Sequence, residues 1–214
     1  MKRDIHTARL ISVTPDAEKQ IAYCARVSSK NQTNESIAGL LRFCMREGHF
    51  SIFEQAHMTV EVLTTPEISR QLLRHHDMRF QEFSQRYQDA SELGSWVIPN
   101  LRRQDAKNRQ SSHDDLDPDF KRLMEQKIET LFAQTFDLYE HMLDQGVAKE
   151  TARSILPIGG TRTKLYATTN LRTWIFYLKS RTDKATQLEH RLVAEAIKDI
   201  FEEQFPTIYE AAFT

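Results

Sequence analysis

The side chains best suited to chemistry lie in one arginine-rich stretch, residues 71–87. Three arginines occur there among serine and glutamine side chains: Arg74, Arg79 and Arg86. A guanidinium group binds phosphate through two parallel hydrogen bonds, and hydroxyl and amide groups add neutral donors. The stretch therefore indicates a binding site for a phosphorylated ligand. The competing interpretation is a solvated helix end with surface ion pairs, because Asp77 and Glu82 are mixed in with the arginines.

A second group of arginines, with one asparagine, occupies the last third of the chain: Arg153, Arg162, Asn170, Arg172 and Arg181. Any one of them has a simpler explanation. Arg181 ends an apolar run, and an arginine at the end of a helix often only complements the helix dipole. Spacing alone therefore does not assign these residues to a site.

Histidine, aspartate and cysteine offer two further chemistries. A helical metal-dependent phosphohydrolase acting on nucleotides would use ligands of the kind found at His49, His57, His76 and Asp77. The doublet of His76 and Asp77 is a weak signal, however, and no metal site is expected. Cys24 and Cys44 lie on apolar faces of expected helices and lack CxxC spacing, so we interpret them as small core side chains.

Length and composition limit the class of protein. The chain has 214 residues, which fits a single domain, 1–214. The 29 Lys and Arg nearly balance the 30 Asp and Glu, which excludes a strongly basic body for binding nucleic acid. Hydrophobic residues make up 40% and charged residues 28%, as in an ordinary soluble globular protein. No apolar run suits a membrane span or a secretory signal, so we expect a cytoplasmic protein without membrane contact.

Helices should position most of these side chains, because only six glycines and six prolines interrupt the chain. Alternation and apolar runs predict strands at 4–13, 57–64 and 163–169. Helical spacing predicts helices at 14–27, 34–47, 66–75, 120–145, 149–155, 171–180 and 186–204, with a last turn after Pro206. Pro15 should lie in the first turn of its helix.

Residues 76–91 should be loop and extended chain, and the polar stretch at about 95–118 should be a mobile surface excursion. The fold class is α+β: a helix-dominated single domain with a small mixed or antiparallel sheet.

Five short motifs follow one another along the chain. They are Ala25-Arg26-Val27-Ser28; His49-x-Ser51-x-Phe53-Glu54; Arg74-His75-His76 with Ser84 after seven residues, flanked by Glu82 and Arg86; Ala152-Arg153-x-x-Leu156-Pro157; and Asn170-x-Arg172 with a later Arg181. Together, over about residues 20–90 and 145–212, they resemble the flavin-dependent thymidylate synthases. The stretch at 95–118 matches none of these motifs.

The resemblance implies the reductive methylation of dUMP to dTMP. Methylene-tetrahydrofolate would supply the carbon, reduced FAD would supply the hydride, and NADPH would recharge the flavin. All of these ligands are anions, which an arginine-lined cleft in a near-neutral protein can concentrate. The family also implies a homotetramer whose sites are shared between subunits, so the motifs need not meet within one chain.

The resemblance further implies roles for individual residues. The residues that would bind dUMP are Gln71, Glu82, Ser84, Gln85, Arg86, Arg153 and Arg181. Among them Arg153 would hold the phosphate, and Arg181, the catalytic residue, would hold the uracil and stabilise negative charge on the ring. The residues that would line FAD are Ser28, Ser51, Arg74, His75, His76, Glu82, Asn170 and Arg172. His49 would lie near the flavin and the folate.

Two positions depart from the family pattern. His76 stands where the family has an arginine that helps to hold the flavin, and Phe176 stands where the family often has an asparagine. Two other functions stay open at this point: the metal-dependent phosphohydrolase, and a non-catalytic module that binds nucleotides or RNA through its arginines. The latter lacks the alternation of aromatic and basic residues that RNA-binding sheets show.

Overall fold

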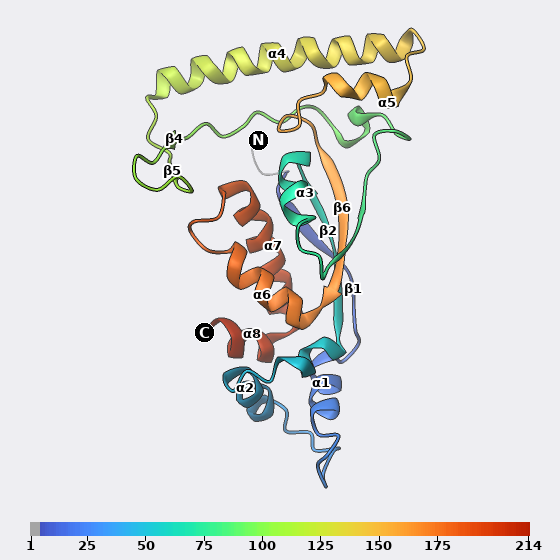
Figure 1. The fold of residues 1–214 in the computed structure, drawn as a ribbon, viewed down its shortest axis with the longest axis vertical. Helices are drawn as coiled ribbons and strands as arrows, with labels where there is room; N and C mark the ends of the chain where they lie inside the picture. The colour runs from blue at the N-terminus through green and yellow to red at the C-terminus, as the bar shows by residue number, and fades with distance from the viewer. Residues whose placement is uncertain (1–4) are drawn as a thin grey trace.

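A four-stranded antiparallel sheet forms the centre of the protein in the computed structural model, which describes residues 5–214 (Figure 1). Its strands are β1 (Thr7–Val13), β2 (His57–Thr64), β3 (Arg79–Glu82) and β6 (Thr163–Asn170), in the order β1-β2-β6-β3. β6 pairs with β2 along its whole length and with β3 from Leu165 to Thr168. The predicted α+β class is confirmed, and the sheet is antiparallel rather than mixed.

Eight α-helices lie in the described residues: α1 (Ala17–Ala25), α2 (Ala38–Arg46), α3 (Pro66–Leu72), α4 (Pro118–Asp144), α5 (Lys149–Ala152), α6 (Leu171–Arg181), α7 (Leu188–Gln204) and α8 (Pro206–Phe213). Three short 3-10 helices accompany them: η1 (Phe50–Gln55), η2 (Ala90–Leu93) and η3 (Arg153–Ile155). Pro66, Pro118 and Pro206 each occupy the first turn, where the missing N–H costs nothing. No helix in residues 5–214 combines the length and apolarity that crossing a membrane requires.

The main core lies between one face of the sheet and the C-terminal helices. Alternate β2 residues are buried, Met58, Val60 and Val62 among them, as expected for a strand with one covered face. Apolar side chains of α6 and α7 pack in the same cluster, and Trp174 donates its indole N–H to the Met58 carbonyl at 3.0 Å. The core therefore fixes α6 and α7 relative to β2 and β6.

Three predicted boundaries are wrong for local reasons. Pro15 precedes α1 instead of lying in its first turn, because Asp16 adopts a left-handed conformation with φ 47° before the helix begins. The helix expected from residue 34 begins at Ala38, because Asn34 and Ser36 are engaged in loop hydrogen bonds, two of them from the Arg26 guanidinium at 2.5 Å. The first strand begins at Thr7, and residue 4 lies outside the described residues.

α4 lies apart from the sheet and packs on α5 and η3 (Figure 1). Its buried residues are Phe136 and Tyr139, in a small second core with Ala90, Ala152 and Leu156. On the other side of the helix, Phe120, Leu131 and Leu138 are about half exposed. At 3.6 residues per turn these three fall within about 20° of one another around the helix axis. We call them the α4 stripe.

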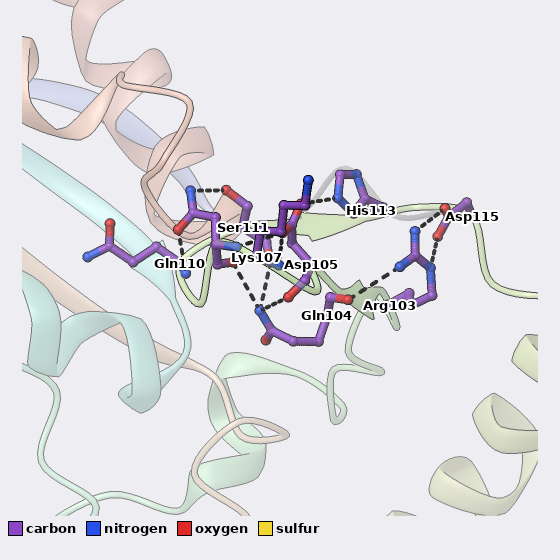
Figure 2. A network of polar contacts seen from close by, with 9 residues as sticks. Arg103, Gln104, Asp105, Lys107, Gln110, Ser111, His113 and Asp115 are labelled. Atoms are coloured by element: carbon purple, nitrogen blue, oxygen red, sulfur yellow. Dashed lines mark hydrogen bonds and ion pairs between the residues drawn. The ribbon is translucent and has the colours of Figure 1, made fainter.

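The polar excursion contains a small hairpin that the sequence did not predict, formed by β4 (Arg103–Gln104) and β5 (Ser112–His113). Figure 2 shows Asp105 inside a network of polar contacts. Its carboxylate accepts hydrogen bonds from the Lys107 and Asn108 backbone N–H groups, each at 2.7 Å, and lies 2.6 Å from His113 Nε2. The Asn108 backbone, the His113 ring and the Lys107 backbone lower the pKa of Asp105 to about 2. Side-chain hydrogen bonds thus brace a segment that has no apolar core.

Candidate functional site

Several of the predicted site residues line one cavity of about 840 Å³, here called the arginine cavity. The loop after α3 and the start of β3 supply Arg74, His75, His76, Asp77 and Arg79. β6 and α6 supply Asn170, Arg172, Thr173, Phe176 and Tyr177, and η1 supplies Glu54. Pairing of β3 with β6 is what brings the two sequence-distant arginine groups together.

Hydrogen bonds hold several of these side chains in place. The Arg172 guanidinium pairs with the Glu54 carboxylate, so the motif containing His49 and Glu54 reaches the cavity through its last residue. Asn170 caps α6 by accepting a hydrogen bond from the Thr173 N–H at 2.9 Å. Arg79 donates to the His76 carbonyl at 2.8 Å. With three arginines beside two aromatic rings, the cavity suits a ligand that carries both phosphate and ring systems.

A second cavity of about 1040 Å³, here called the hairpin cavity, is lined by residues of the β4–β5 hairpin and of the turn from α6 to α7. Figure 1 shows these two segments on the same side of the molecule. Six of its lining residues are cationic: Arg102, Arg109, Lys179, Arg181, Lys184 and Arg191. The excursion is therefore one wall of a cavity that contains the predicted catalytic arginine. This placement could not be predicted from the sequence, because the composition of a polar stretch does not indicate which distant turn the stretch will cover.

His75 and Arg181 connect the two cavities. The Arg181 Nε–H donates to His75 Nε2 at 3.2 Å, and the His75 ring meets Tyr177 edge to face at 5.0 Å between centroids. Because Nε2 accepts this bond, His75 is neutral and carries its proton on Nδ1. Burial, then the Arg181 charge and His76, lower the pKa of His75, which favours the same state. The two terminal nitrogens of Arg181 remain available for a ligand in the hairpin cavity.

The predicted dUMP residues fall into two groups. Arg181 lines the hairpin cavity with Gln187, which accepts a 2.7 Å hydrogen bond from Gln71. The other predicted dUMP residues line neither cavity: Gln71, Glu82, Ser84, Gln85, Arg86 and Arg153. Arg86 instead forms a half-exposed ion pair with Glu150 at 3.1 Å, and Arg153 begins η3. Glu82, on β3, accepts a hydrogen bond from the Thr163 hydroxyl at 2.8 Å.

Three more predicted residues lie outside both cavities. Ser28 is exposed after α1, Ser51 is exposed on η1, and His49 packs its ring against Phe43 at 5.8 Å. Cys44 is buried, and burial raises the pKa of its thiol, while Cys24 is half-buried. Cys44 therefore has the expected core role, whereas Cys24 belongs to neither core cluster. Within residues 5–214, no three His, Cys, Asp or Glu side chains are grouped to hold a metal ion.

Comparison with known proteins identifies the relatives of this chain. The family profile described as "Thymidylate synthase complementing protein" matches residues 9–207. A flavin-dependent thymidylate synthase of Synechocystis sp. is 50% identical over 194 residues, covering 91% of this chain and 88% of the relative. A probable flavin-dependent thymidylate synthase of Paramecium bursaria Chlorella virus 1 is 45% identical, covering 96% and 98%.

A solved structure has the same fold. A UMP/dUMP methylase, PolB from Streptomyces cacaoi, superimposes with a TM-score of 0.82 in its crystal structure with 5-Br dUMP, at 28% identity. That match covers 96% of this chain and 93% of the methylase. The crystal structure of the methylase with 5-Br UMP gives a TM-score of 0.84, at the same identity. The two alternative functions, the metal phosphohydrolase and the RNA-binding module, find no support among these relatives.

Proposed function

The chain belongs to the flavin-dependent thymidylate synthase family, and from this premise we propose how its own residues serve the reductive methylation of dUMP to dTMP. Bound FAD, recharged by NADPH, supplies the hydride, and methylene-tetrahydrofolate supplies the carbon. The observation that carries the proposal is the arginine cavity, where Arg74, Arg79 and Arg172 converge from separate parts of the chain.

The donors of the arginine cavity fit FAD. Its three arginines suit the two phosphates of a dinucleotide, and the exposed Phe176 ring offers apolar surface for a ring system. Arg74, His75, His76, Asn170 and Arg172 are the residues we assign to FAD, together with Glu82. Ser28, Ser51 and His49 lie outside the cavity, so we assign them to the FAD and folate site of a neighbouring subunit.

Arg181 is assigned to the uracil ring. Its Nε–H is occupied by His75, which fixes the plane of the guanidinium and leaves both terminal nitrogens to face the ring. A bidentate contact of this kind stabilises negative charge that develops on the uracil during the reaction. Gln71, which donates a hydrogen bond to Gln187, is assigned to the same nucleotide.

The phosphate of dUMP is assigned to Ser84, Gln85, Arg86 and Arg153 of another subunit. These residues lie away from Arg181 within one chain, so a complete site needs residues from a second copy. The α4 stripe supports this arrangement, because three half-exposed apolar side chains on one face of a long helix are suited to burial against another subunit. We therefore propose a homotetramer with shared sites.

Purified protein tests the proposal directly. It should carry the visible absorption spectrum of oxidised flavin and should form dTMP from dUMP only when methylene-tetrahydrofolate and NADPH are both added. Omission of each component in turn is the control. A flavin-free protein, or one that forms no dTMP with FAD added, would contradict the proposal.

UMP is a second candidate substrate, because the structurally similar methylase is named for both UMP and dUMP. The same assay with UMP in place of dUMP decides between them. Methylation of dUMP at least tenfold faster than that of UMP is expected for a thymidylate synthase, and equal rates would assign the broader substrate class.

A further inference from the structure

An unbroken chain of side-chain hydrogen bonds runs from the excursion to the protein core and passes through Gln71. Arg102 binds the Glu189 carboxylate through two hydrogen bonds, of 2.6 and 2.9 Å. Glu189 accepts from the Gln187 amide at 3.1 Å, and Gln187 accepts from the Gln71 amide at 2.7 Å. Gln71 Oε1 then lies 3.1 Å from His190 Nδ1. None of these residues belongs to the family motifs described above, and Gln71 is the only one to which the resemblance assigns a role.

The carboxylates at one end set the direction of every bond in this chain. An ionised carboxylate only accepts, so the NH₂ group of Gln187 must face Glu189 and also Glu67, which it meets at 2.9 Å. The carbonyl of Gln187 therefore faces Gln71, so the NH₂ group of Gln71 must donate to it. The carbonyl of Gln71 then faces His190, which must donate from Nδ1. A reversed amide anywhere would place two donors or two acceptors opposite each other.

The other end of the hydrogen-bond chain lies in the protein core. His190 is fully buried, and its Nε2 lies 3.2 Å from the hydroxyl of the buried Tyr177. With the proton on Nδ1, Nε2 accepts, and the Tyr177 hydroxyl donates. Burial, then the Arg181 charge and a smaller contribution from the nearby His75 ring, lower the pKa of His190 to about 4, so the ring stays neutral near pH 7. Burial also raises the pKa of Tyr177, which keeps its hydroxyl proton.

The two carboxylates at the opposite end of the hydrogen-bond chain, Glu189 and Glu67, are also held in place. Burial, the largest single influence, raises the pKa of Glu189, but the hydrogen bonds from Arg102, the backbone and Gln187, together with the Arg102 charge, outweigh it, and the pKa lies below its usual value. The Arg102 and Glu189 side chains are only 13% and 16% exposed. Glu67 packs against Gly159, where an added Cβ would lie 2.7 Å from Glu67 Oε2. Both carboxylates are therefore fixed before any ligand binds.

We propose that His190 is a positioning residue for the nucleotide: its Nδ1–H locks the Gln71 amide in one orientation, so that Gln71 presents a fixed donor and a fixed acceptor to dUMP. The proposal rests on the assignment of Gln71 to dUMP. Gln71 keeps one N–H and one carbonyl lone pair after its two internal bonds are made. If the amide could flip, these two groups would exchange places, and a ligand that uses either would lose it part of the time.

Three substitutions of His190 separate this role from simple packing. His190→Asn keeps a donor near the Nδ1 position, His190→Gln keeps a polar group near the Nε2 position, and His190→Leu removes both. Gln71→Ala reports whether Gln71 contacts the nucleotide at all. The measurement is the dissociation constant of dUMP for each flavin-loaded protein by isothermal titration calorimetry, with the FAD content of each protein as the check on folding.

We expect dUMP to bind about tenfold more weakly to His190→Leu and His190→Gln, and within about threefold of wild type to His190→Asn. A tenfold change corresponds to about 1.4 kcal/mol, the size of one hydrogen bond. Equal losses in His190→Asn and His190→Leu would overturn the proposal, as would full binding by His190→Leu while Gln71→Ala binds weakly. Full binding by Gln71→Ala would instead overturn the assignment of Gln71 to dUMP.

A second measurement does not depend on the variants folding. Nitrogen chemical shifts of the wild-type histidines, with His190→Asn used to assign the His190 signal, report which ring nitrogen carries the proton. The proposal requires a neutral His190 protonated on Nδ1. A ring protonated on Nε2 would mean that His190 does not donate to Gln71, and would overturn it.

Discussion

At the scale of single residues, two parts of the Arg181 guanidinium have separate roles. Its Nε–H is bonded to a neutral histidine, and its terminal nitrogens face the hairpin cavity. A lysine in its place keeps the charge but has no planar fork, so it cannot both bond His75 and hold a ligand at two points. The geometry of the guanidinium, more than its charge, is what the site requires.

Arg181→Lys should therefore lower transition-state stabilisation by about 2–4 kcal/mol, comparable to the loss of one oxyanion donor. This corresponds to a fall in kcat/KM for dTMP formation of roughly 30- to 1000-fold. The exposed arginine of an ion pair on α4 provides the control, because Arg122→Lys should leave the rate unchanged. Activity of Arg181→Lys within twofold of wild type would show that the role assigned to Arg181 is wrong.

His76 also belongs to this scale, because it replaces an arginine of the family pattern in the wall of the arginine cavity. If His76 faces the flavin phosphates, His76→Arg should tighten FAD binding, because a guanidinium carries a permanent charge and five N–H donors in a planar fork.

Titration of the apoprotein with FAD measures this effect. Arg79→Ala is the comparison, because Arg79 lines the same cavity and supplies a permanent charge three residues away. An unchanged FAD affinity in His76→Arg would rule out a phosphate contact for His76. A loss of affinity confined to Arg79→Ala would identify Arg79 as the replacement for the family arginine.

At the scale of elements, α4 lies apart from the central sheet and packs on α5 and η3. It spans 27 residues and has only two fully buried side chains, whereas the α4 stripe is about half exposed. An amphipathic helix normally directs its apolar residues to the core of its own domain. Here, part of the apolar surface faces away from that core, which is expected of a helix that packs against another subunit.

Leu131→Glu should therefore weaken subunit association, because it places a charge in a buried apolar contact. Sedimentation analysis should show smaller species than wild type, and dTMP formation should fall with them, because the site proposed here uses residues of two chains. Gln126→Glu, an exposed position on a different side of α4, is the matched control and should leave the assembly intact. A Leu131→Glu protein that keeps the wild-type mass would exclude the α4 stripe as a contact between subunits.

At the scale of the whole molecule, buried neutral histidines link folding to pH. His190 has a pKa of about 4 in the folded protein and near 6.5 when unfolded, and the pKa of His75 is also lowered. Between these values the unfolded chain binds more protons than the folded one, so stability rises with pH. The contribution of His190 is complete above about pH 6.5 and is lost as the pH falls toward 4. It amounts to roughly 3 kcal/mol, to order of magnitude.

Urea unfolding at pH 5 and pH 7.5 measures this link. The wild-type midpoint should be clearly higher at pH 7.5, and His190→Asn should narrow the difference between the two pH values. His141→Gln, on the surface of α4, should preserve the wild-type difference. If His190→Asn shows the full wild-type difference, His190 does not account for the pH dependence.

The sequence by itself determined the family, the order of the α-helices and of three strands of the central sheet, and most of their boundaries, but it did not predict β3, β4 or β5. Helical spacing, proline in the first turn and alternation in β2 are signals between near neighbours, and α3, α4 and α7 follow them closely. The motifs likewise indicated Arg74, Asn170 and Arg172, which the fold brings into one cavity. Local periodicity and motif identity are contained in the order of residues, so no folded structure was needed to recognise them.

Only the tertiary structure decided which distant side chains meet. Arg102 and Glu189 are 87 residues apart, and Gln71 and His190 are 119 apart, yet each pair is bonded. No periodic pattern encodes such a pair, because its formation depends on how the sheet, α7 and the excursion pack together. Packing likewise separated Arg181 from Arg86 and Arg153, which the motifs had grouped in one site. The protonation state of His75 and the orientation of the Gln71 amide depend on hydrogen-bond partners, burial and neighbouring charges. These exist only once the elements are assembled.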